Sequence, residues 1–314
     1  MFSVILPVFN GEKFIDSAIA CVLSQTVSDW ELIVINDGST DGTSDVLEKY
    51  RGSDKIHIIN QKNQGVSAAR NVGIDCAKGS HIAFLDADDL WYENHLEVMQ
   101  KLIRKYPTAG LYGTFTRTEL VNGGEITECN YFKNRDEDVF LEDFFADYHR
   151  DKSAKMFTVI TTVISAEAAK KTGGFPIGCV IGEDLELSLK AAAYFPVVLS
   201  KEITAVYRKE NSTATKDVSF DPEWSFFDTA VEIYNDAEIP AAKRENLRKV
   251  MQWFTMRRVR HYIIDGKKKK AWQTYLSAER GLLIKGDWII NLVLLLMPVW
   301  VVRKIFAVRW RGKA

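Results

Sequence analysis

The chain has 314 residues, of which 41 are lysine or arginine and 42 are aspartate or glutamate, so its formal net charge is −1. This length predicts one large or two modest domains, with ample apolar material for a buried core. The balanced charge creates no overall positive field, which argues against nucleic acid as a partner.

The four cysteines, Cys21, Cys76, Cys129 and Cys179, are scattered among apolar neighbours and show no paired spacing. We interpret them as reduced structural residues in a cytosolic compartment, where disulfides are rare. Residues 2–6 are too few for a secretory signal and lack a basic leader and a small-residue cleavage site. The sequence therefore predicts a cytoplasmic protein.

The first ninety residues alternate predicted strands with predicted helices. Apolar runs predict strands over 2–8, 30–36, 56–60 and 82–85. Helical spacing of apolar residues predicts helices over 14–25, 43–51 and 66–77. Pro7 is expected to end the first strand, because proline cannot donate to a sheet ladder. The alternation predicts a parallel sheet with right-handed crossovers.

Polar residues follow each of these four strands, at 7–10, 37–41, 60–63 and 86–89. The carboxyl ends of parallel strands lie along one edge of the sheet, and ligands of open α/β sheets bind at that edge. No Gly-x-Gly-x-x-Gly follows the first strand and no Walker lysine motif occurs, so the usual dinucleotide and P-loop fingerprints are absent from the sequence.

Three carboxylates, Asp86, Asp88 and Asp89, come directly after the fourth strand. Such close like charges repel one another, and a divalent cation with oxygen ligands would relieve the repulsion while bridging to substrate phosphates. The alternative is a helix N-terminus, because residues 90–106 have helical character and aspartate is a favoured cap. The residues alone leave both interpretations open.

Beyond Pro107 the pattern changes to short strands and helices. Strands are predicted over 110–120, 124–131, 158–164, 197–199 and 203–207, with a hairpin turn at 122–124. A short helix is predicted over 167–171 and another over 182–193. Glu183 and Asp184 lie at the start of that last helix. They form either an acidic first turn that suits the helix dipole or a general base for a hydroxyl proton.

From residue 221 onward the chain is predicted to be helical, over 224–236, 241–264 and 267–285. The most apolar stretch, 288–302, has fifteen residues. At ~1.5 Å per residue it covers roughly 22 Å, short of the ~30 Å hydrocarbon core of a bilayer.

The apolar stretch also contains Pro298 and lies in a basic part of the chain with Trp288, Trp300 and Trp310. These features favour interfacial or re-entrant attachment to a membrane over a full span. The alternative is a helix pair packed on the body of the protein. We divide the chain into a domain of residues 1–212, a helical region 213–286 and a membrane-associating tail 287–314.

Five motifs, taken together and in this order, resemble those of inverting family 2 glycosyltransferases. They are VILPVFN (4–10), VINDGSTD (34–41), NQGVSAARN (63–71), FLDADD (84–89) and GED (182–184). The resemblance spans about residues 1–210. It implies the GT-A fold, an α/β class with a Rossmann-like, mostly parallel sheet flanked by helices, followed in this chain by a helical C-terminal extension.

The resemblance also implies site residues. The nucleotide-sugar site would consist of Pro7, Val8, Asn10, Glu12, Asp37, Asn63, Arg70 and Asp86. Asp37 would accept the imide N–H of uracil, while Asn63 and Arg70 would lie near the base and the phosphates. Asp86 and Asp88 would form the Asp-x-Asp motif that holds Mn²⁺ or Mg²⁺ on the diphosphate, with Asp89 as a further candidate ligand. Asp184 would be the catalytic base and Glu183 its neighbour.

The implied activity is transfer of a sugar from a UDP-sugar to a hydroxyl of a glycan or lipid-linked acceptor, in surface polysaccharide synthesis. The Gln-x-x-Arg-Trp motif of processive synthases is not matched at 252–258, so we expect one sugar to be transferred per binding event. The enzyme would be peripheral on the inner face of the cell membrane, attached through its C-terminal tail. Residues after 210 share no motif with the family, so the acceptor site is not predicted.

Three other classes of protein are alternatives to a glycosyltransferase. Haloacid dehalogenase-type phosphohydrolases also place Asp-x-Asp at a strand end, but after the first strand, whereas this motif follows the fourth and precedes Asp89. A non-catalytic UDP- or membrane-binding module would bind nucleotide without turnover. A nucleotidyltransferase would show a glycine-rich, basic loop after its first strand, which is absent from the sequence.

Overall fold

The computed structural model describes residues 1–119, 125–126, 137–150, 158–179, 182–208, 226–277 and 285–311. The chain forms two compact units, Met1–Ser219 and Phe220–Ala314. The boundary predicted between residues 212 and 213 lies outside the described residues, so that assignment stays a prediction.

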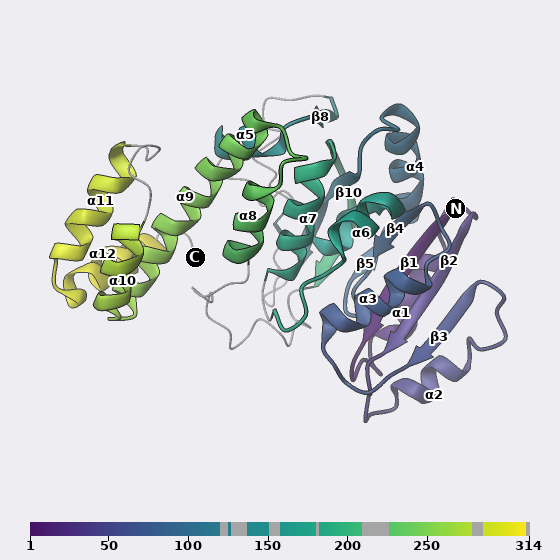
Figure 1. Ribbon diagram of the computed structural model, residues 1–314. Helices are drawn as coiled ribbons and strands as arrows, with labels where there is room; N and C mark the ends of the chain where they lie inside the picture. Colours follow the sequence, from purple (N-terminus) through teal and green to yellow (C-terminus); the bar gives the residue numbers. More distant parts are fainter. Residues whose placement is uncertain are drawn as a thin grey trace. The chain divides into compact units, whose positions relative to one another are not determined.

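A mixed sheet is the centre of the first unit (Figure 1). The strand order is β3-β2-β1-β4-β9-β6-β10-β5, with β7 beside β6 and β8 beside β10. The strands are β1 Phe2–Val8, β2 Trp30–Asn36, β3 Ile56–Asn60, β4 His81–Phe84, β5 Leu90–Trp91, β6 Leu111–Glu119, β7 Glu125–Ile126, β8 Val139–Leu141, β9 Thr162–Ser165 and β10 Val197–Arg208. The helices are α1 Ile15–Leu23, α2 Thr43–Glu48, α3 Val66–Cys76, α4 His95–Lys105, α5 Phe144–Arg150, α6 Ala166–Thr172 and α7 Glu183–Tyr194.

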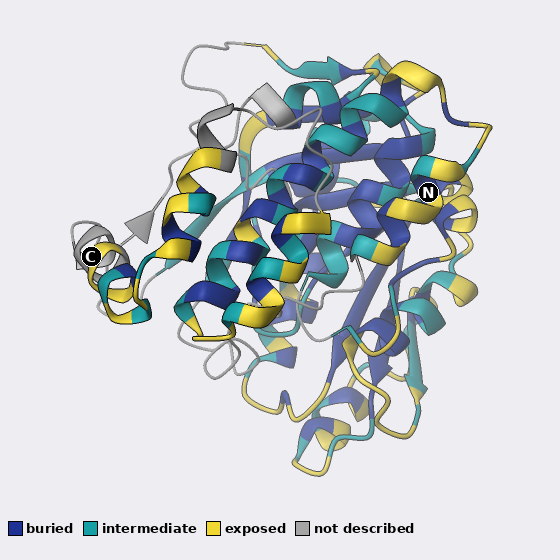
Figure 2. Ribbon diagram, turned by 60° about the vertical axis from the view of Figure 1, so that its left-hand side comes forward, coloured by how far each residue is buried: buried dark blue, intermediate teal, exposed yellow. Residues whose placement is uncertain are grey.

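The first four strands are parallel, as their alternation with helices predicts. All residues of β1 and β2 are buried, and these strands form the dark blue centre of the sheet in Figure 2. Strands buried on both faces are continuous apolar runs, which explains why the sequence pattern identifies them. The predicted α/β class with a mostly parallel sheet flanked by helices is confirmed, although β9 joins β4 in an antiparallel arrangement.

The first strand continues through Pro7 instead of ending there. The carbonyl of Ile5 accepts from the N–H of Leu85 at 3.0 Å, and the carbonyl of Val8 accepts from the N–H of Asp37 at 2.8 Å. Neighbouring residues of a strand bond to opposite partner strands, so Pro7 faces the β4 side, where pairing stops at Phe84. The missing N–H of proline therefore interrupts no ladder.

The helix predicted over 90–106 begins only at His95. Leu90 and Trp91 instead pair antiparallel with β10, and the indole nitrogen of Trp91 donates to the carbonyl of Ile160 at 2.6 Å. The N-cap of α4 is Asn94, so none of the carboxylates of 86–89 caps this helix. The capping interpretation of these carboxylates is wrong, because pairing with a distant strand overrides the local helical pattern.

Other predicted elements change in detail. The predicted hairpin pairs Thr118 with Ile126 on β6 and β7, and its turn at 120–124 lies outside the described residues. The strand predicted over 158–164 starts at Thr162, after a 3₁₀ turn (η2, Val159–Thr161). The two strands predicted between 197 and 207 form the single strand β10, which has irregular register between Leu199 and Ala205.

The second unit is helical in its described residues. It contains α8 Phe226–Asn235, α9 Ala241–Ile264, α10 Lys268–Ser277, α11 Lys285–Leu296 and α12 Val299–Arg311. The bounds of α9 agree with the prediction. The helix predicted over 267–285 is described only to Ser277, and the predicted tail boundary at residue 287 falls within α11. Pro298 separates α11 from α12, as its inability to continue a helix requires.

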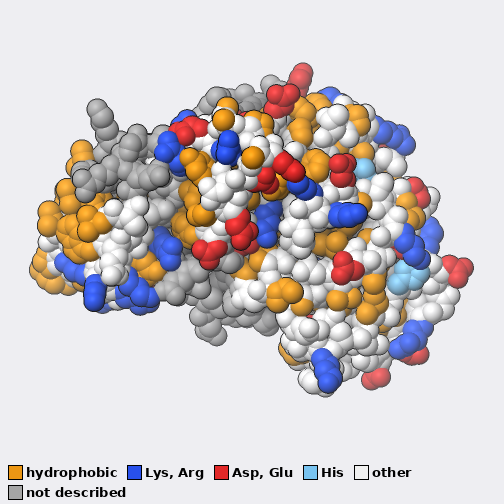
Figure 3. All heavy atoms as spheres, in the orientation of Figure 1, with side chains coloured by type: hydrophobic (Ala, Val, Ile, Leu, Met, Phe, Trp, Pro, Cys, Tyr) orange, Lys and Arg blue, Asp and Glu red, His pale blue; other side chains and the backbone are white. Residues whose placement is uncertain are grey.

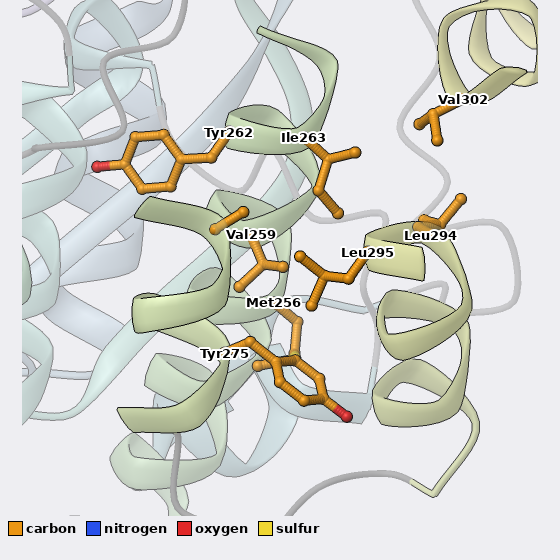
Figure 4. Close-up of a cluster of buried hydrophobic side chains, with 9 residues drawn as sticks. Met256, Val259, Tyr262, Ile263, Tyr275, Leu294, Leu295 and Val302 are labelled. Atoms are coloured by element: carbon orange, nitrogen blue, oxygen red, sulfur yellow. The ribbon is translucent and has the colours of Figure 1, made fainter. Parts of the chain in front are cut away.

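The apolar stretch 288–302 takes part in the core of this helical unit (Figure 4). Buried side chains from four helices form one cluster: Met256, Val259, Tyr262 and Ile263 of α9, Ala271 and Tyr275 of α10, Leu294 and Leu295 of α11, and Val302 of α12. Within the described residues, no helix has the length and apolar content that crossing a bilayer demands.

Candidate active site

The loops that follow β1 and β2 are tied to each other at the carboxyl edge of the sheet. The backbone N–H of Asn10 donates to Ser39 Oγ at 2.9 Å, and the N–H of Thr40 donates to Asn10 Oδ1 at 2.8 Å. The carboxylate of Glu12 accepts from the N–H of Gly42 at 3.2 Å. Asn10 has a φ of 52°, a left-handed conformation that asparagine tolerates better than most residues. Asn10 and Glu12 thus fix the shape of this edge.

Asp37, at the end of β2, holds the loop that follows β3. It is buried, and its Oδ1 accepts from Gln61 Nε2 at 2.7 Å and from the N–H of Gln64 at 3.0 Å. Its Oδ2 accepts from the N–H of Gly65 at 2.9 Å. An ionised carboxylate has about four acceptor positions, so these three bonds leave about one for a ligand.

The other residues predicted on the nucleotide side lie around these loops. Pro7 and Val8 are buried in β1, and a Cβ on Gly11 would meet Val8 Cγ2 at 2.5 Å, so Val8 supports the turn above it. Asn63 is exposed on the β3–α3 loop. A Cβ on Gly38, which has a φ of +76°, would lie 2.7 Å from the backbone nitrogen of Asn63, so glycine permits the two loops to touch.

Arg70 of α3 connects the carboxylate groups of two distant segments. Its Nη2 lies 2.7 Å from Asp86 Oδ1 and its Nη1 lies 2.9 Å from Glu183 Oε1. The side chain is 3% exposed, and its guanidinium carbon lies 5.1 Å from the ring centroid of Phe175. Asp86 and Glu183 raise the pKa of Arg70 against the effect of its burial, so the guanidinium stays charged. The structure therefore brings together α3, the end of β4 and the start of α7.

Asp88 and Asp89 are crowded with Asp86 in a largely buried place. Burial, and then Asp86, raise the pKa of Asp88. Burial, and then Asp86 and Asp88, raise the pKa of Asp89 to about 8. Arg208, the last residue of β10, donates its backbone N–H to Asp89 Oδ1 at 2.9 Å and its Nε to the carbonyl of Asp88 at 2.7 Å. Arg208 thus ties the far strand β10 to the acidic segment.

Asp184 lies in the first turn of α7, beside Glu183. The helix follows Gly182, whose φ of 90° is a left-handed conformation that favours glycine. Asp184 keeps partial access to solvent, and Oδ1 accepts from the N–H of Leu185 at 2.7 Å. Desolvation by the surrounding protein, and then the charge of Glu183, raise the pKa of Asp184 to about 6. A carboxylate with this pKa is ionised at neutral pH and can still take up a proton.

The acidic segment offers oxygen ligands for a divalent cation. Within the described ranges, no three His, Cys, Asp or Glu side chains are grouped as a complete metal site. Asp86 and Asp88 nevertheless offer carboxylate oxygens, the ligands that Mg²⁺ and Mn²⁺ prefer. Mg²⁺ is commonly held by one or two protein carboxylates together with substrate phosphates and water. Burial and then the charge of Asp86 raise the pKa of Asp88, and such a cation would relieve the repulsion between these two carboxylates. The donor set therefore fits.

The site also includes residues that sequence reasoning did not identify. Gln61 and Gln64 bond to Asp37, Phe175 packs on Arg70, and Arg208 binds the segment containing Asp88 and Asp89. Gln64 lies inside the third motif, NQGVSAARN (63–71), so the motif itself indicates this residue. Arg208 and Phe175 are far from the motifs along the chain, and only the fold brings them to this edge.

The predicted site residues form two groups that α3 connects. Asp37 binds Gly65 immediately before the helix, and Arg70 lies within it. Asn10, Glu12, Asp37 and Asn63 belong to loops on the first side. On the second side are Arg70, Asp86, Asp88, Asp89, Glu183 and Asp184. The structure thus brings most of the predicted residues to the sheet edge, while Pro7 and Val8 lie beneath it.

The family model described as "Glycosyl transferase family 2" matches residues 3–159, which is half of the 314-residue chain. A curated relative is the Escherichia coli protein WfgD, a UDP-Glc:alpha-D-GlcNAc-diphosphoundecaprenol beta-1,3-glucosyltransferase. It is 35% identical over 126 residues, which are 40% of this chain and 49% of WfgD. The chain thus spans about half the length of WfgD, and between 15% and 39% of seven further curated relatives.

Solved structures share the fold. S. aureus TarS 1–349 in complex with UDP has a TM-score of 0.70 at 19% identity, covering 98% of this chain and 91% of that one. The mannosyltransferase PcManGT from Pyrobaculum calidifontis, in complex with GDP-Man and Mn²⁺, has a TM-score of 0.55 at 16% identity, covering 94% and 85%. The predicted GT-A fold is confirmed.

Proposed function

The chain belongs to glycosyl transferase family 2, and we propose that it is an inverting, metal-dependent glycosyltransferase. It moves one sugar from a nucleoside-diphosphate sugar to a hydroxyl of its acceptor. UDP is the proposed nucleotide, supported by the UDP-Glc donor in the name of WfgD and by UDP in the TarS complex. The transferred group is a hexosyl or N-acetylhexosaminyl unit.

The observation that carries the proposal is the buried Arg70, which joins Asp86 to Glu183. Asp86 belongs to the acidic segment after β4, and Glu183 is adjacent to Asp184 in α7. Arg70 thus holds two kinds of carboxylate at the same sheet edge. The segment of Asp86 is suited to binding a cation, and Asp184, beside Glu183, is suited to proton transfer. Sugar transfer from a diphosphate requires these two tasks on the two sides of one sugar.

Asp86 and Asp88 are the proposed ligands of Mn²⁺ or Mg²⁺. When bound, the cation supplies electrostatic stabilisation of the negative charge on the leaving diphosphate. Asp89 is buried and bonded to the backbone of Arg208, so we assign it to positioning of the segment more than to ligation. Arg70 then sets the orientation of Asp86 through the contact of 2.7 Å.

Asp184 is the proposed general base. The acceptor hydroxyl is a weak nucleophile, and removal of its proton by Asp184 Oδ assists attack at the anomeric carbon. One displacement without a covalent sugar intermediate inverts the configuration at that carbon. Glu183 is less suited to the task because its Oε1 is already held by Arg70 at 2.9 Å. Its charge instead contributes to the raised pKa of Asp184.

The nucleotide is proposed to lie over the loops after β1, β2 and β3. Asp37 has about one acceptor position left for the imide N–H of uracil. Asn10 and Glu12 keep the first two loops together, and the exposed Asn63 lies beside them. Pro7 and Val8 are buried in β1, beneath these loops.

The acceptor is proposed to be a lipid-linked glycan in surface polysaccharide synthesis. Support comes from WfgD, whose name specifies a diphosphoundecaprenol-linked sugar as its acceptor. A lipid-linked acceptor would require the enzyme to work at a membrane surface, on the cytoplasmic side where nucleotide sugars are made. The basic and apolar helices after residue 285 are the proposed contact with that surface.

The substitution Asp184→Asn tests this function. Asparagine keeps the size of the side chain but cannot accept the proton. We expect UDP affinity to stay within about twofold and the rate of sugar transfer to fall by about 10²–10⁴-fold. Titration calorimetry with UDP and Mn²⁺ measures the first quantity, and UDP release from UDP-sugars in the presence of membrane-extracted acceptors measures the second.

Glu167→Gln is the matched control, because Glu167 also lies in the first turn of a helix, α6, but is exposed. That helix follows Ser165, which pairs with His81 at the end of β4 opposite to Asp86. This variant should transfer sugar at the wild-type rate. Equal transfer by Asp184→Asn and wild type would contradict the assignment of the base. Binding of UDP without transfer by the wild type to any acceptor would instead favour a non-catalytic module.

A further inference from the structure

The outer side of α11 and the start of α12 expose an apolar surface. In the described residues, thirteen large apolar side chains are exposed, and six of them lie between residues 289 and 305. Ile289, Ile290, Val293 and Leu296 follow one another at helical spacing along α11, with exposed fractions of 43% to 69%. Trp300 follows on α12, 64% exposed. Exposed apolar side chains normally occur singly, so this clustering indicates a contact surface.

The opposite side of α11 is fixed in the protein core. Leu294 and Leu295 belong to the buried cluster that α9 and α10 share. Asn291 is fully buried, and its Oδ1 accepts from Arg260 Nε of α9 at 2.9 Å. The exposed side chains of α11 therefore cannot turn inward, because doing so would remove Leu294, Leu295 and Asn291 from these contacts.

Two basic side chains also fasten the junction of α11 and α12. Lys268 Nζ donates to the carbonyls of Leu295 and Met297, at 3.2 and 2.7 Å, at the C-terminus of α11. Arg303 Nε of α12 donates to the carbonyl of Ile264 at 2.8 Å, at the end of α9. Cations at these carbonyl ends also match the helix dipoles. The segment is thus a built-in part of the helical unit and not a separable tail.

Basic side chains border the apolar surface. Lys267 and Lys269 flank Lys268 and are exposed, and the Nζ of Lys304 lies 5.5 Å from the ring centroid of Trp300. Figure 3 shows orange side chains over the part of the molecule that Figure 1 labels α11, with lysine and arginine side chains along one border. Among the side chains described from residue 246 onward, Asp265 is the single acidic one, and its Oδ2 lies 3.6 Å from Lys267 Nζ.

We propose that this surface, formed by Ile289, Ile290, Val293, Leu296 and Trp300, lies in the interface of an anionic phospholipid bilayer with α11 parallel to the membrane plane. The inference deepens the proposed function, from which it takes the membrane surface as partner, and it specifies which side chains make the contact. The apolar side chains enter the headgroup boundary, while Lys267, Lys269 and Lys304 approach the phosphates.

The arrangement of charges favours a bilayer over another protein as the occupant. Exposed lysines beside apolar side chains suit lipid, because the ammonium groups can extend to phosphates while their methylene stems cover apolar surface. Tryptophan beside lysine is typical of the membrane interface. Lysine is by contrast depleted in protein–protein interfaces. A helix that is apolar on both sides and fixed in a core on one of them is therefore best placed in the plane of a membrane.

The test is binding of the full chain to vesicles, measured by co-sedimentation without sugar donor. We expect binding to phosphatidylcholine vesicles that contain about 30% phosphatidylglycerol, and loss of most binding without the anionic lipid or above about 0.5 M salt. Val293→Glu should weaken binding about tenfold or more, because it removes apolar area and adds a charge that anionic lipid repels. Val231→Glu is the matched control, since Val231 is 49% exposed on α8, and it should bind as the wild type does.

Circular dichroism and melting temperature establish that each variant is folded. If Val293→Glu melts below the wild type, Leu296→Gln replaces it, because Leu296 is 69% exposed. The proposal is overturned if the wild type does not bind anionic vesicles. It is also overturned if the folded apolar-surface variant, Val293→Glu or Leu296→Gln, binds them as strongly as the wild type does. It is also overturned if ultracentrifugation finds a dimer that Val293→Glu dissociates, since a second copy would then cover the surface. Vesicle binding requires no transfer, so an inactive chain that binds would refute only the proposed activity.

Discussion

At the scale of single residues, Arg70 joins the carboxylates of the candidate site. Its guanidinium is buried between Asp86 and Glu183. Burial and then the charge of Glu183 raise the pKa of Asp184, and the charge of Arg70 lowers it. Burying three charges together is costly unless each is paired. In this chain the pairing links the motif around residue 70 to the two acidic motifs, although they lie far apart along the chain.

The raised pKa of Asp184 predicts how transfer depends on pH. The base must be ionised, so kcat/KM should fall as the pH decreases through about 6, and below that value it should drop about tenfold per pH unit. Initial rates between pH 4.5 and 8 in saturating Mn²⁺ measure this limb. Variants of Arg70 should shift the pH position of this acid limb, whereas a residue with a purely structural role would leave that position unchanged. In Arg70→Gln, loss of the positive charge should move the limb to higher pH, because Arg70 lowers the pKa of Asp184.

Arg70→Lys is the matched variant, since it keeps the charge but loses the two-sided contact with Asp86 and Glu183. Its acid limb should stay near the wild-type position while kcat falls. If the acid limb lies at the same pH in the wild type, the Lys variant and the Gln variant, Arg70 does not affect the pKa of Asp184. Thermal unfolding of each variant separates this effect from loss of the fold.

At the scale of elements, the packing of α3 on the sheet positions Arg70. A Cβ on Gly73, within α3, would lie 2.5 Å from Ile5 Cγ2 and 3.0 Å from Ile35 Cδ1, side chains of the buried strands β1 and β2. Glycine at this position therefore lets the helix approach the sheet closely. The distance between α3 and the sheet in turn sets where the guanidinium of Arg70 can meet Asp86 and Glu183.

Gly73→Ala should destabilise the protein by about 1–2 kcal/mol. Overpacking a buried contact costs roughly 1–3 kcal/mol, which exceeds the gain of up to about 1 kcal/mol from better helix propensity. Urea denaturation measures the difference. Gly52→Ala is the control, because a Cβ on Gly52 meets nothing within 4 Å, and its stability should change by less than about 0.5 kcal/mol. A Gly73→Ala variant as stable as the wild type would mean that the close packing is not required.

At the scale of the whole molecule, the first unit, Met1–Ser219, contains every candidate site residue, and the second, Phe220–Ala314, contains the apolar and basic surface. This division separates the two proposals physically. Sugar transfer depends on the sheet edge of the first unit, and membrane contact depends on helices of the second. Each can therefore be tested with variants that leave the other unit unchanged.

Ligand binding should be visible as stabilisation of the first unit, which contains the candidate site. UDP with Mn²⁺ at about 100 times its dissociation constant stabilises the native state by ~2.7 kcal/mol, which predicts a rise in melting temperature of roughly 5–10 °C for a unit of this size. GDP and dTDP should produce smaller shifts. Asp88→Asn should lose the part of the shift that depends on Mn²⁺. A larger melting-temperature shift with GDP than with UDP would contradict the proposed nucleotide. An unchanged Mn²⁺-dependent shift in Asp88→Asn would contradict the assignment of Asp88 as a metal ligand.

The alternation of strands and helices up to residue 85 follows from the amino-acid sequence, because buried parallel strands are recognisable as apolar runs and their crossovers as helical periodicity. The sequence also placed Asp86, Asp88 and Asp184 at element ends, and the order of five motifs indicated the family. These are local properties of the chain, and local patterns record which side of an element is buried.

The partners of each element, in contrast, depend on the three-dimensional fold. Leu90 and Trp91 pair with β10 instead of starting a helix, Arg208 reaches the acidic segment, and Arg70 pairs with Glu183, which lies 113 residues further along the chain. The fold likewise decided that one side of the apolar stretch 288–302 belongs to a core while the other is exposed. Such choices depend on contacts between distant segments, whose free energies are not encoded in the periodicity of either segment alone.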